Sequence, residues 1–175
     1  GAKVIEAYES FALVDMDMAA MQSLKDSGLQ LNAIEGSTTI SMKSCTFDRT
    51  AGEPELPSEL RMTEVAGRDG LYLVQFTGPV KAEWLDELTA MGIGTYSYVP
   101  NYAQIARMPA DRVPVVESLD FVDWVGAYHP AYRISPGTTG GRMYVNVWNG
   151  PGAAETLKAL SAMTAVESCS YDSYF

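Results

Sequence analysis

The sequence is poor in the residues from which enzymes build most catalytic and metal sites. Its 175 residues include one histidine, His129, and two cysteines, Cys45 and Cys169. A single histidine excludes a multi-histidine metal site, and no CxxC pair offers zinc spacing. No apolar run approaches the ~18 residues that a membrane-spanning helix needs. Basic residues are also scarce, since 12 lysines and arginines face 22 acids, and this balance disfavours nucleic acid as a partner.

The remaining chemical motifs are weak, and we expect no catalysis, no cofactor and no metal. His129 is followed by proline just past an expected strand end, with no serine or cysteine at an activating spacing, so a solvated loop histidine is expected. Gly150-Pro151-Gly152 precedes an expected helix. Proline at the first helical position removes an amide that would hold phosphate. Cys45 and Cys169 are either two small half-buried residues or the two ends of one disulfide.

An internal repeat organises the second half of the chain. A shift of 72 residues aligns 71–91 with 143–163 without a gap. Each copy begins with an apolar, aromatic-rich hexapeptide, LYLVQF in the first and MYVNVW in the second, followed by a Gly-Pro pair and an amphipathic stretch. Coincident strand, turn and helix signals favour a duplicated structural unit over chance similarity.

The first copy predicts a complete two-layer module. Four apolar and aromatic stretches favour strands at 71–76, 95–99, 103–108 and 121–128. Apolar residues at helical spacing predict helices at 81–91 and 111–119. The order strand-helix-strand-strand-helix-strand is the ferredoxin-like plan, an α+β fold with both helices on one face of an antiparallel sheet. We expect the other face of that sheet to be open.

The second copy is incomplete. It predicts a strand at 142–148, a helix at 153–163 and a strand at about 165–174, where the sequence stops. Half a module leaves an unpaired strand edge and an uncovered helix face. We therefore expect the partner strands to come from a longer polypeptide beyond Phe175 or from a second copy of the chain, as a homodimer.

The first 52 residues predict a less regular strand-helix-hairpin module. A long strand at 4–16, bent near Ser10, precedes a helix at 18–27 and a hairpin of 29–34 with 38–43. Asp17 suits the N-cap of that helix, and Gly28 suits its end. The expected organisation is a module at 1–52, a linker at 53–69, a complete ferredoxin-like module at 70–134, a linker at 135–141 and a half module at 142–175.

Aromatic side chains are the candidate binding residues of the complete module. Tyr96, Tyr98, Trp124 and Tyr128 occupy even positions of the second and fourth expected strands. Alternation places each pair on one face of the sheet. If that face lies opposite the helices, these residues form a platform for a protein partner; if it lies under the helices, they are core.

Four segments resemble the amino-terminal region of secreted archaeal and bacterial subtilisin-like serine proteases. They lie at 8–11, 45–48, 70–80 and 121–132, and the last, FVDWVGAYHPAY, is the most specific. The resemblance implies ferredoxin-like propeptide modules that act as folding chaperones and inhibitors. In that family the propeptide sheet packs on the catalytic domain and its tail lies along the substrate cleft.

The resemblance does not extend to the family's catalytic machinery. Asp26-Ser27-Gly28 looks like its aspartate motif, but Gly28 is an ordinary helix end there, and the histidine and serine motifs are missing. We therefore expect a non-catalytic, secreted or cell-surface region whose partner is a subtilisin-like catalytic domain beyond Phe175. The alternative is a structural or adhesion-type accessory module that binds a protein without inhibiting a protease.

Overall fold

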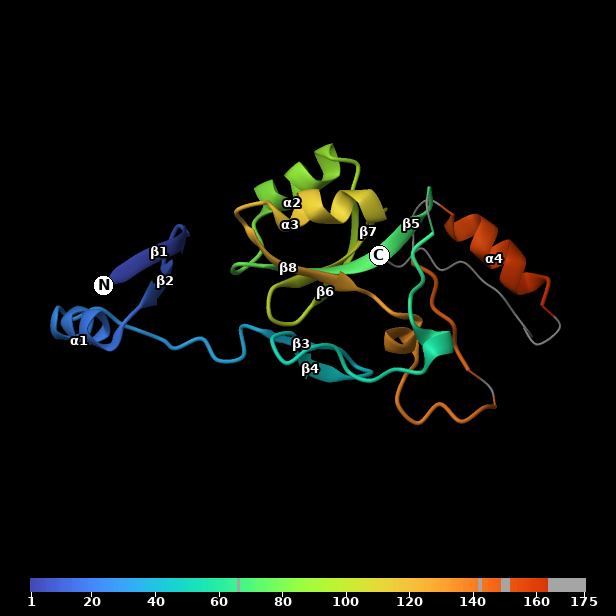
Figure 1. Ribbon diagram of the computed structural model, residues 1–175, viewed down its shortest axis with the longest axis horizontal. Helices are drawn as coiled ribbons and strands as arrows, with labels where there is room; N and C mark the ends of the chain where they lie inside the picture. Colours follow the sequence, from blue (N-terminus) through green and yellow to red (C-terminus); the bar gives the residue numbers. More distant parts are fainter. Residues whose placement is uncertain (66, 142, 149–151, 164–175) are drawn as a thin grey trace. The chain divides into compact units, whose positions relative to one another are not determined.

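The computed structural model describes residues 1–65, 67–141, 143–148 and 152–163 (Figure 1). The chain divides into two compact units, Gly1–Thr138 and Thr139–Phe175. The first unit is an α+β structure with antiparallel sheets. Its strands are β1 (Ala2–Ala7), β2 (Ala12–Met16), β3 (Thr39–Ser41), β4 (Thr46–Asp48), β5 (Asp69–Phe76), β6 (Gly94–Val99), β7 (Ala103–Pro109) and β8 (Val122–Ala127). Its helices are α1 (Met18–Asp26), α2 (Ala82–Ala90) and α3 (Val113–Glu117), with 3₁₀ turns η1 (Ser58–Leu60), η2 (Ala110–Arg112) and η3 (Pro130–Arg133).

A four-stranded antiparallel sheet forms the centre of the first unit. Its strand order is β6-β7-β5-β8, so β5 pairs with β7 on one side and β8 on the other. The element order predicted for 71–128 is confirmed, with η2 and α3 in place of one longer helix. Helices α2 and α3 cover one face of the sheet, and the β3-β4 hairpin lies against the opposite face (Figure 1).

The core beneath the helices follows from strand alternation. Tyr72, Val74 and Phe76 of β5 are buried in one cluster with Trp84 and Leu88 of α2. Successive side chains of a strand point to opposite faces, so every second residue of β5 reaches the helices. The rings of Phe76 and Trp84 stack with centroids 5.7 Å apart. This apolar layer fixes α2 and α3 on the sheet.

The amino-terminal strand is a hairpin, which corrects the prediction of one bent strand at 4–16. Strands β1 and β2 pair antiparallel, and the Tyr8 amide donates to the Phe11 carbonyl at 2.8 Å to close the turn. The rings of Tyr8 and Phe11 stack at 4.4 Å, which supports the reversal. The hairpin contacts the loop before α2, where the Tyr8 hydroxyl donates to the Pro79 carbonyl and Lys81 pairs with Glu6 at 2.6 Å.

Helix α1 begins where the sequence predicts and ends at Asp26, one residue before the predicted end. The Asp17 carboxylate accepts the Ala20 amide at 2.8 Å, the bond expected of an N-cap. Gly28 follows the helix with φ of +84°, a left-handed conformation that glycine adopts without strain. The Asp26-Ser27-Gly28 sequence is thus a helix end, as the sequence indicates.

The second predicted hairpin is wrong in its pairing. Residues 29–36 form no strand, and β3 pairs instead with β4. The Met42 amide donates to the Cys45 carbonyl at 2.9 Å, so the chain reverses there rather than at Gly36. Burial of Ile40 and Phe47, which face each other in the register, stabilises this choice.

The second unit contains the predicted helix but lacks the first predicted strand. Helix α4 spans Ala153–Ser161, within the predicted 153–163. Residues 143–148 are described and form no strand, which corrects the prediction at 142–148. A strand needs a neighbour for its backbone groups, and the described part of this unit holds no strand to pair with it. The strand predicted at 165–174 lies outside the described residues.

Candidate functional site

The sheet face opposite the helices is covered, which corrects the prediction that it is open. Leu73 of β5 and Ile105 of β7 pack there against Ile40 and Phe47 of the β3-β4 hairpin. The segment expected as a linker at 53–69 contributes Leu56 to the same apolar cluster. We call the β3-β4 hairpin and the segment around Leu56 the cover. A protein partner therefore contacts the cover rather than a bare sheet face.

A buried polar network fastens the hairpin to the sheet. The Gln75 side chain is 0% exposed and donates to the carbonyls of Ser37 and Asn101, both at 2.9 Å. Its carbonyl oxygen accepts from the Arg49 guanidinium at 2.6 Å, and Arg49 also pairs with Asp123. Every polar atom of the Gln75 side chain thus has a partner, which offsets the desolvation of burying it.

His129 anchors the cover at its other end. It is only 4% exposed, so the prediction of a solvated loop histidine is wrong. Its Nδ1 accepts the Met62 amide at 2.8 Å, which requires the proton of the neutral ring to lie on Nε2. Nε2 then donates to Glu53 at 3.0 Å, and Arg61 lies 3.7 Å from the same carboxylate. Both ring nitrogens are occupied, which leaves neither available to act as a general base.

A solvent-open hollow of about 440 Å³ lies where the cover meets the edge strand β6. We call it the Tyr98 hollow. Its walls come from the turn after β3, the end of β6, β7 and the segment after β8, and consist of Ser41, Met42, Lys43, Tyr98, Val99, Pro100, Ile105, Tyr128 and Tyr132. Tyr98 is 54% exposed, whereas Tyr128 and Tyr132 form a buried floor. An apolar, aromatic hollow of this kind suits the side chain of a bound partner.

The four predicted aromatic residues are only partly brought together. Tyr98 and Tyr128 both line the Tyr98 hollow. Trp124 packs with the apolar cluster under the β3-β4 hairpin, so it belongs to the covered face. Tyr96 contacts the Arg107 guanidinium, and their hydrogen bond raises the pKa of Arg107.

The sequence did not identify Met42, Lys43 or Tyr132 as site residues. Met42 and Lys43 reach the hollow through the β3-β4 turn, more than 50 positions before Tyr98. Tyr132 lies four residues beyond the strand expected at 121–128, and in the sequence it belongs only to the segment 121–132 that carries the resemblance. Its hydroxyl is buried without a hydrogen-bond partner among the described residues, and burial raises its pKa.

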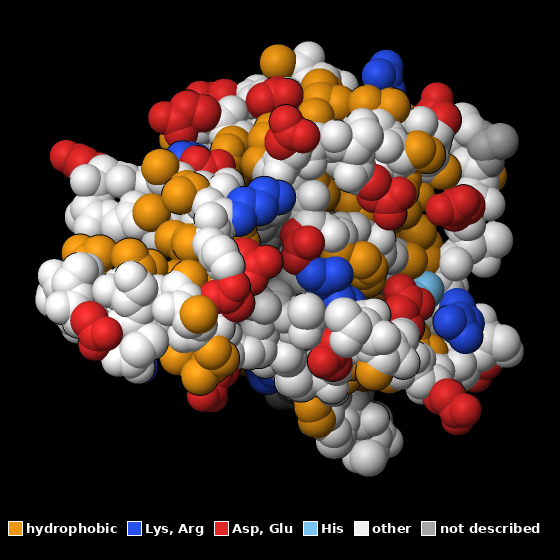
Figure 2. Space-filling view, turned by 60° about the vertical axis from the view of Figure 1, so that its left-hand side comes forward, with side chains coloured by type: hydrophobic (Ala, Val, Ile, Leu, Met, Phe, Trp, Pro, Cys, Tyr) orange, Lys and Arg blue, Asp and Glu red, His pale blue; other side chains and the backbone are white. Residues whose placement is uncertain are grey.

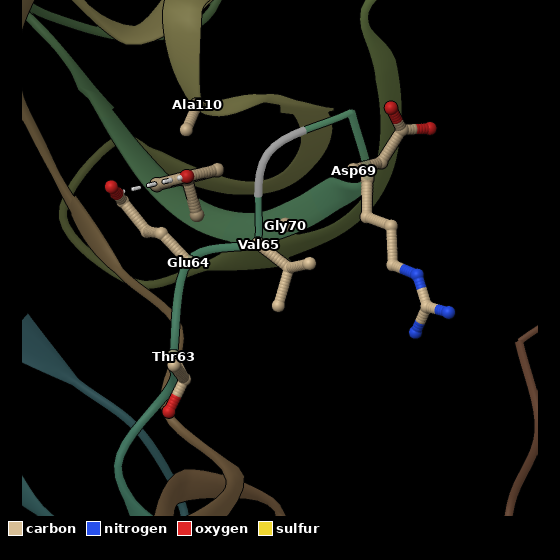
Figure 3. Close-up of a pocket in the computed structure, with 8 residues that line it drawn as sticks. Thr63, Glu64, Val65, Asp69, Gly70 and Ala110 are labelled. Atoms are coloured by element: carbon tan, nitrogen blue, oxygen red, sulfur yellow. Dashed lines mark hydrogen bonds between the residues drawn. The ribbon is translucent and has the colours of Figure 1, made fainter.

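A second, smaller hollow of about 150 Å³ lies beside the start of β5 (Figure 3). The Tyr72 hydroxyl donates to Glu64 at 3.2 Å across it, and burial, followed by the Glu64 charge, raises the pKa of Tyr72 to about 12. Asp69 points away from Glu64 and pairs with Arg107 at 2.9 Å. Because its acids are already engaged, this hollow is a weaker candidate for binding than the Tyr98 hollow.

One of the two cysteines, Cys45, lies among the described residues. Cys45 carries a half-buried thiol, and burial raises its pKa, which disfavours the reactive thiolate. Cys169, the other cysteine of the predicted bridge, lies outside the described residues. No group of three acidic, cysteine or histidine side chains that could hold a metal ion occurs among the residues that the structure describes. Over the same residues, no helix is long and apolar enough to cross a membrane.

These features define an α+β protein whose antiparallel sheet is covered on both faces and which carries an aromatic hollow beside an edge strand. A family model described as a domain of unknown function (DUF8729) matches residues 41–129, just over half of the chain, and the chain belongs to that family. The matched region contains the last residue of β3, all of β4 and the complete four-stranded sheet, and it begins just after Ile40. No curated protein and no solved structure matches the chain.

Proposed function

We propose that the chain is a non-catalytic protein-binding region and that the Tyr98 hollow is its contact site. The observation that carries this proposal is a half-exposed tyrosine at the mouth of an apolar, aromatic hollow that opens to solvent. Aromatic residues with one apolar face and one polar end are enriched where proteins bind one another. The engagement of both nitrogens of His129, the one histidine, further supports a role without catalysis.

The proposed fold within this class is ferredoxin-like. The strand order β6-β7-β5-β8, with two helices on one face, supports a ferredoxin-like module at 70–134. The 72-residue repeat supports a second, partial module at 142–175, and helix α4 is consistent with it. The proposal thus keeps a tandem arrangement of one complete and one partial module, and the β3-β4 hairpin packs on the sheet of the complete module.

The proposed partner is a subtilisin-like catalytic domain, as the resemblance of 121–132 implies. The proposed region is a secreted or cell-surface propeptide that assists folding and inhibits the protease. The covered sheet changes how such a contact would be made. Phe47 and Leu56 lie over the apolar face that a bare propeptide sheet would present. Contact would therefore use the Tyr98 hollow and the edge strand β6.

The test is inhibition of a purified subtilisin-like catalytic domain from the same source. With the chain present at about 1 to 100 µM, cleavage of a chromogenic peptide should slow in a saturable way. The variant Tyr98→Ala should inhibit at least about tenfold more weakly, because loss of a central aromatic contact commonly costs more than 1 kcal/mol. Tyr144→Ala is the matched control, since Tyr144 is 99% exposed in the second unit, and it should inhibit like the parent chain. Unchanged cleavage rates across this range would contradict inhibition.

A structural or adhesion-type accessory module is the second candidate. The observation that favours it is the cover itself, because the network of Arg49, Gln75 and Asp123 and the anchor at His129 hold it firmly in place. A module of this kind would bind a protein partner while leaving protease rates unchanged. The inhibition assay therefore separates the two candidates.

A further inference from the structure

The walls of the Tyr98 hollow differ in charge from the rest of the chain. The chain carries 22 acidic and 12 basic side chains, and the face shown in Figure 2 has acidic side chains scattered among its apolar ones. None of the residues that line the hollow is acidic, and one of them, Lys43, is basic. A cation-bearing, acid-free hollow on an acidic protein favours a ligand that carries negative charge.

Arg133 adds a second cation beside the same walls. Its guanidinium lies 5.4 Å from the ring centre of Tyr128, which forms part of the floor of the hollow, and it donates to the Tyr128 carbonyl at 3.4 Å. Arg133 is exposed overall, and desolvation of its guanidinium lowers its pKa. Neither Arg133 nor Lys43 forms an ion pair with an acid among the described residues. A carboxylate that arrived with a ligand would supply the missing counter-charge.

Shape and position favour an extended ligand. The hollow lies at the end of β6, which is an edge strand of the four-stranded sheet. Edge strands commonly pair with an extended peptide while a nearby pocket accepts one of its side chains. A volume of about 440 Å³ accommodates one aromatic or large aliphatic side chain with its backbone.

We propose that the Tyr98 hollow binds an extended acidic peptide, with an aromatic or aliphatic side chain between Tyr98 and Tyr128 and a neighbouring carboxylate near Lys43 and Arg133. The inference rests on the proposed protein-binding function and names the chemistry of the partner segment. Acidity would select the segment, and the apolar side chain would supply most of the affinity.

The test uses three acetylated, amidated peptides of about ten residues. The first carries a central Phe-Glu pair in a Gly-Ser background, the second replaces Glu by Gln, and the third replaces Phe by Ala. Titration of the ¹⁵N-labelled full chain should shift the amides of 41–43 and 98–99 in a saturable way with the Phe-Glu peptide. We expect the Gln peptide to bind at least about fivefold more weakly and the Ala peptide at least about tenfold more weakly.

Charge reversal provides the matched variants. Lys43→Glu should weaken binding of the Phe-Glu peptide at least about fivefold. It should also remove the preference of the chain for the Phe-Glu peptide over the Gln peptide. Lys158→Glu is the control, because Lys158 is an exposed residue of α4, and it should leave both affinities unchanged. Both lysines lie at the surface, so circular dichroism should show the parent fold for each variant.

Two results would overturn the inference: no saturable shift at up to about 2 mM peptide, or equal affinity for the Glu and Gln peptides. The outcome is independent of the inhibition assay. Peptide binding without any effect on a protease would leave this inference standing and remove the propeptide function. Inhibition of the protease without any saturable peptide shift would remove this inference and leave the propeptide function standing.

Discussion

The two copies of the repeat have similar sequences but very different surroundings. In the first copy, Tyr72 and Phe76 are buried in a central strand. In the second copy, the equivalent Tyr144 is 99% exposed and 143–148 forms no strand. The helices differ in the same way, since α2 buries Trp84 and Leu88, whereas the only buried residue of α4 is Ala153.

This difference shows that an apolar hexapeptide specifies a strand only when partner strands are at hand. In the first copy, β5 hydrogen-bonds to β7 and β8, which lie later in the same unit. The described part of the second unit offers no such strands. Helix formation is local, because each backbone bond spans four residues, so α4 forms without them.

The largest expected contrast is between the two equivalent helix leucines. Leu88, on the buried face of α2, is 0% exposed, whereas Leu160 of α4 is half-buried. Leu88→Ala should lower the free energy of unfolding of the first unit by about 3 to 5 kcal/mol, because it opens a cavity in a packed core. Leu160→Ala should change it by less than about 0.5 kcal/mol, as expected for independent sites.

Urea unfolding followed by tryptophan fluorescence provides the measurement. Carrying Trp148→Phe in all variants confines the signal to Trp84 and Trp124 of the first unit. Equal losses for the two leucine variants would mean that the two copies share one core. Near-parental stability of Leu88→Ala would show that α2 is not fixed by apolar packing.

A smaller contrast is expected between Gln75 of β5 and the residue that aligns with it in the second copy. Gln75, which fastens the cover, aligns with Val147 in the second copy. Gln75→Val should leave the carbonyls of Ser37 and Asn101 and the Nε of Arg49 without their Gln75 partner and lower the free energy of unfolding by about 2 to 3 kcal/mol. Val147→Gln, the reciprocal change, should alter it by less than about 0.5 kcal/mol.

Amide exchange at the β3-β4 hairpin tests whether this loss belongs to the cover. The amides of Ile40 and Arg49 should exchange faster in Gln75→Val, because the hairpin loses its attachment to β5. A stability loss with unchanged exchange there would contradict the role assigned to Gln75. Loss of stability in Val147→Gln would reveal a core in the second unit that the sequence alignment does not imply.

The module was predictable from sequence because its signals are local and strong. Strands β5 to β8 and helix α2 each have a clear apolar period, and Asp17 and Gly28 mark both ends of α1. The pairing of β1 with β2 was not predictable, since the turn at Glu9-Ser10 lacks glycine and proline. Strands β3 and β4 are three residues each, too short for a periodic signal.

The candidate site was predictable only where it lies on the regular strands. Alternation along the expected strands identified Tyr98 and Tyr128. Lys43 enters the hollow from a distant turn, and no periodicity links it to β6. His129 was misjudged for the same reason, because its partners Met62 and Glu53 lie 67 and 76 positions away. Long-range packing of this kind leaves no trace in local sequence patterns.

The smallest expected contrast concerns the hydroxyl groups of the equivalent tyrosines. The Tyr72 hydroxyl donates to Glu64 (Figure 3), and its burial raises the pKa of Tyr72 to about 12. Tyr72→Phe should lower the free energy of unfolding at pH 7 by about 0.5 to 1.5 kcal/mol through loss of this bond. Tyr144→Phe should have no measurable effect, because the Tyr144 ring lies in solvent.

The pH dependence of this contrast has a definite sign. A tyrosine ionises near pH 10 in an unfolded chain, whereas folding raises the pKa of Tyr72 to about 12. Its neutral form therefore contributes stability that is complete below about pH 10 and is lost as the pH rises from about 10 to 12. Urea unfolding at pH 7 and at about pH 11 should show the advantage of the parent chain over Tyr72→Phe shrinking, while Tyr144→Phe follows the parent at both. If the difference in the free energy of unfolding between the parent chain and Tyr72→Phe stayed constant, Tyr72 would ionise as easily in the folded protein as in the unfolded chain. Burial of Tyr72 against Glu64 would then be too loose to set it apart from the exposed Tyr144.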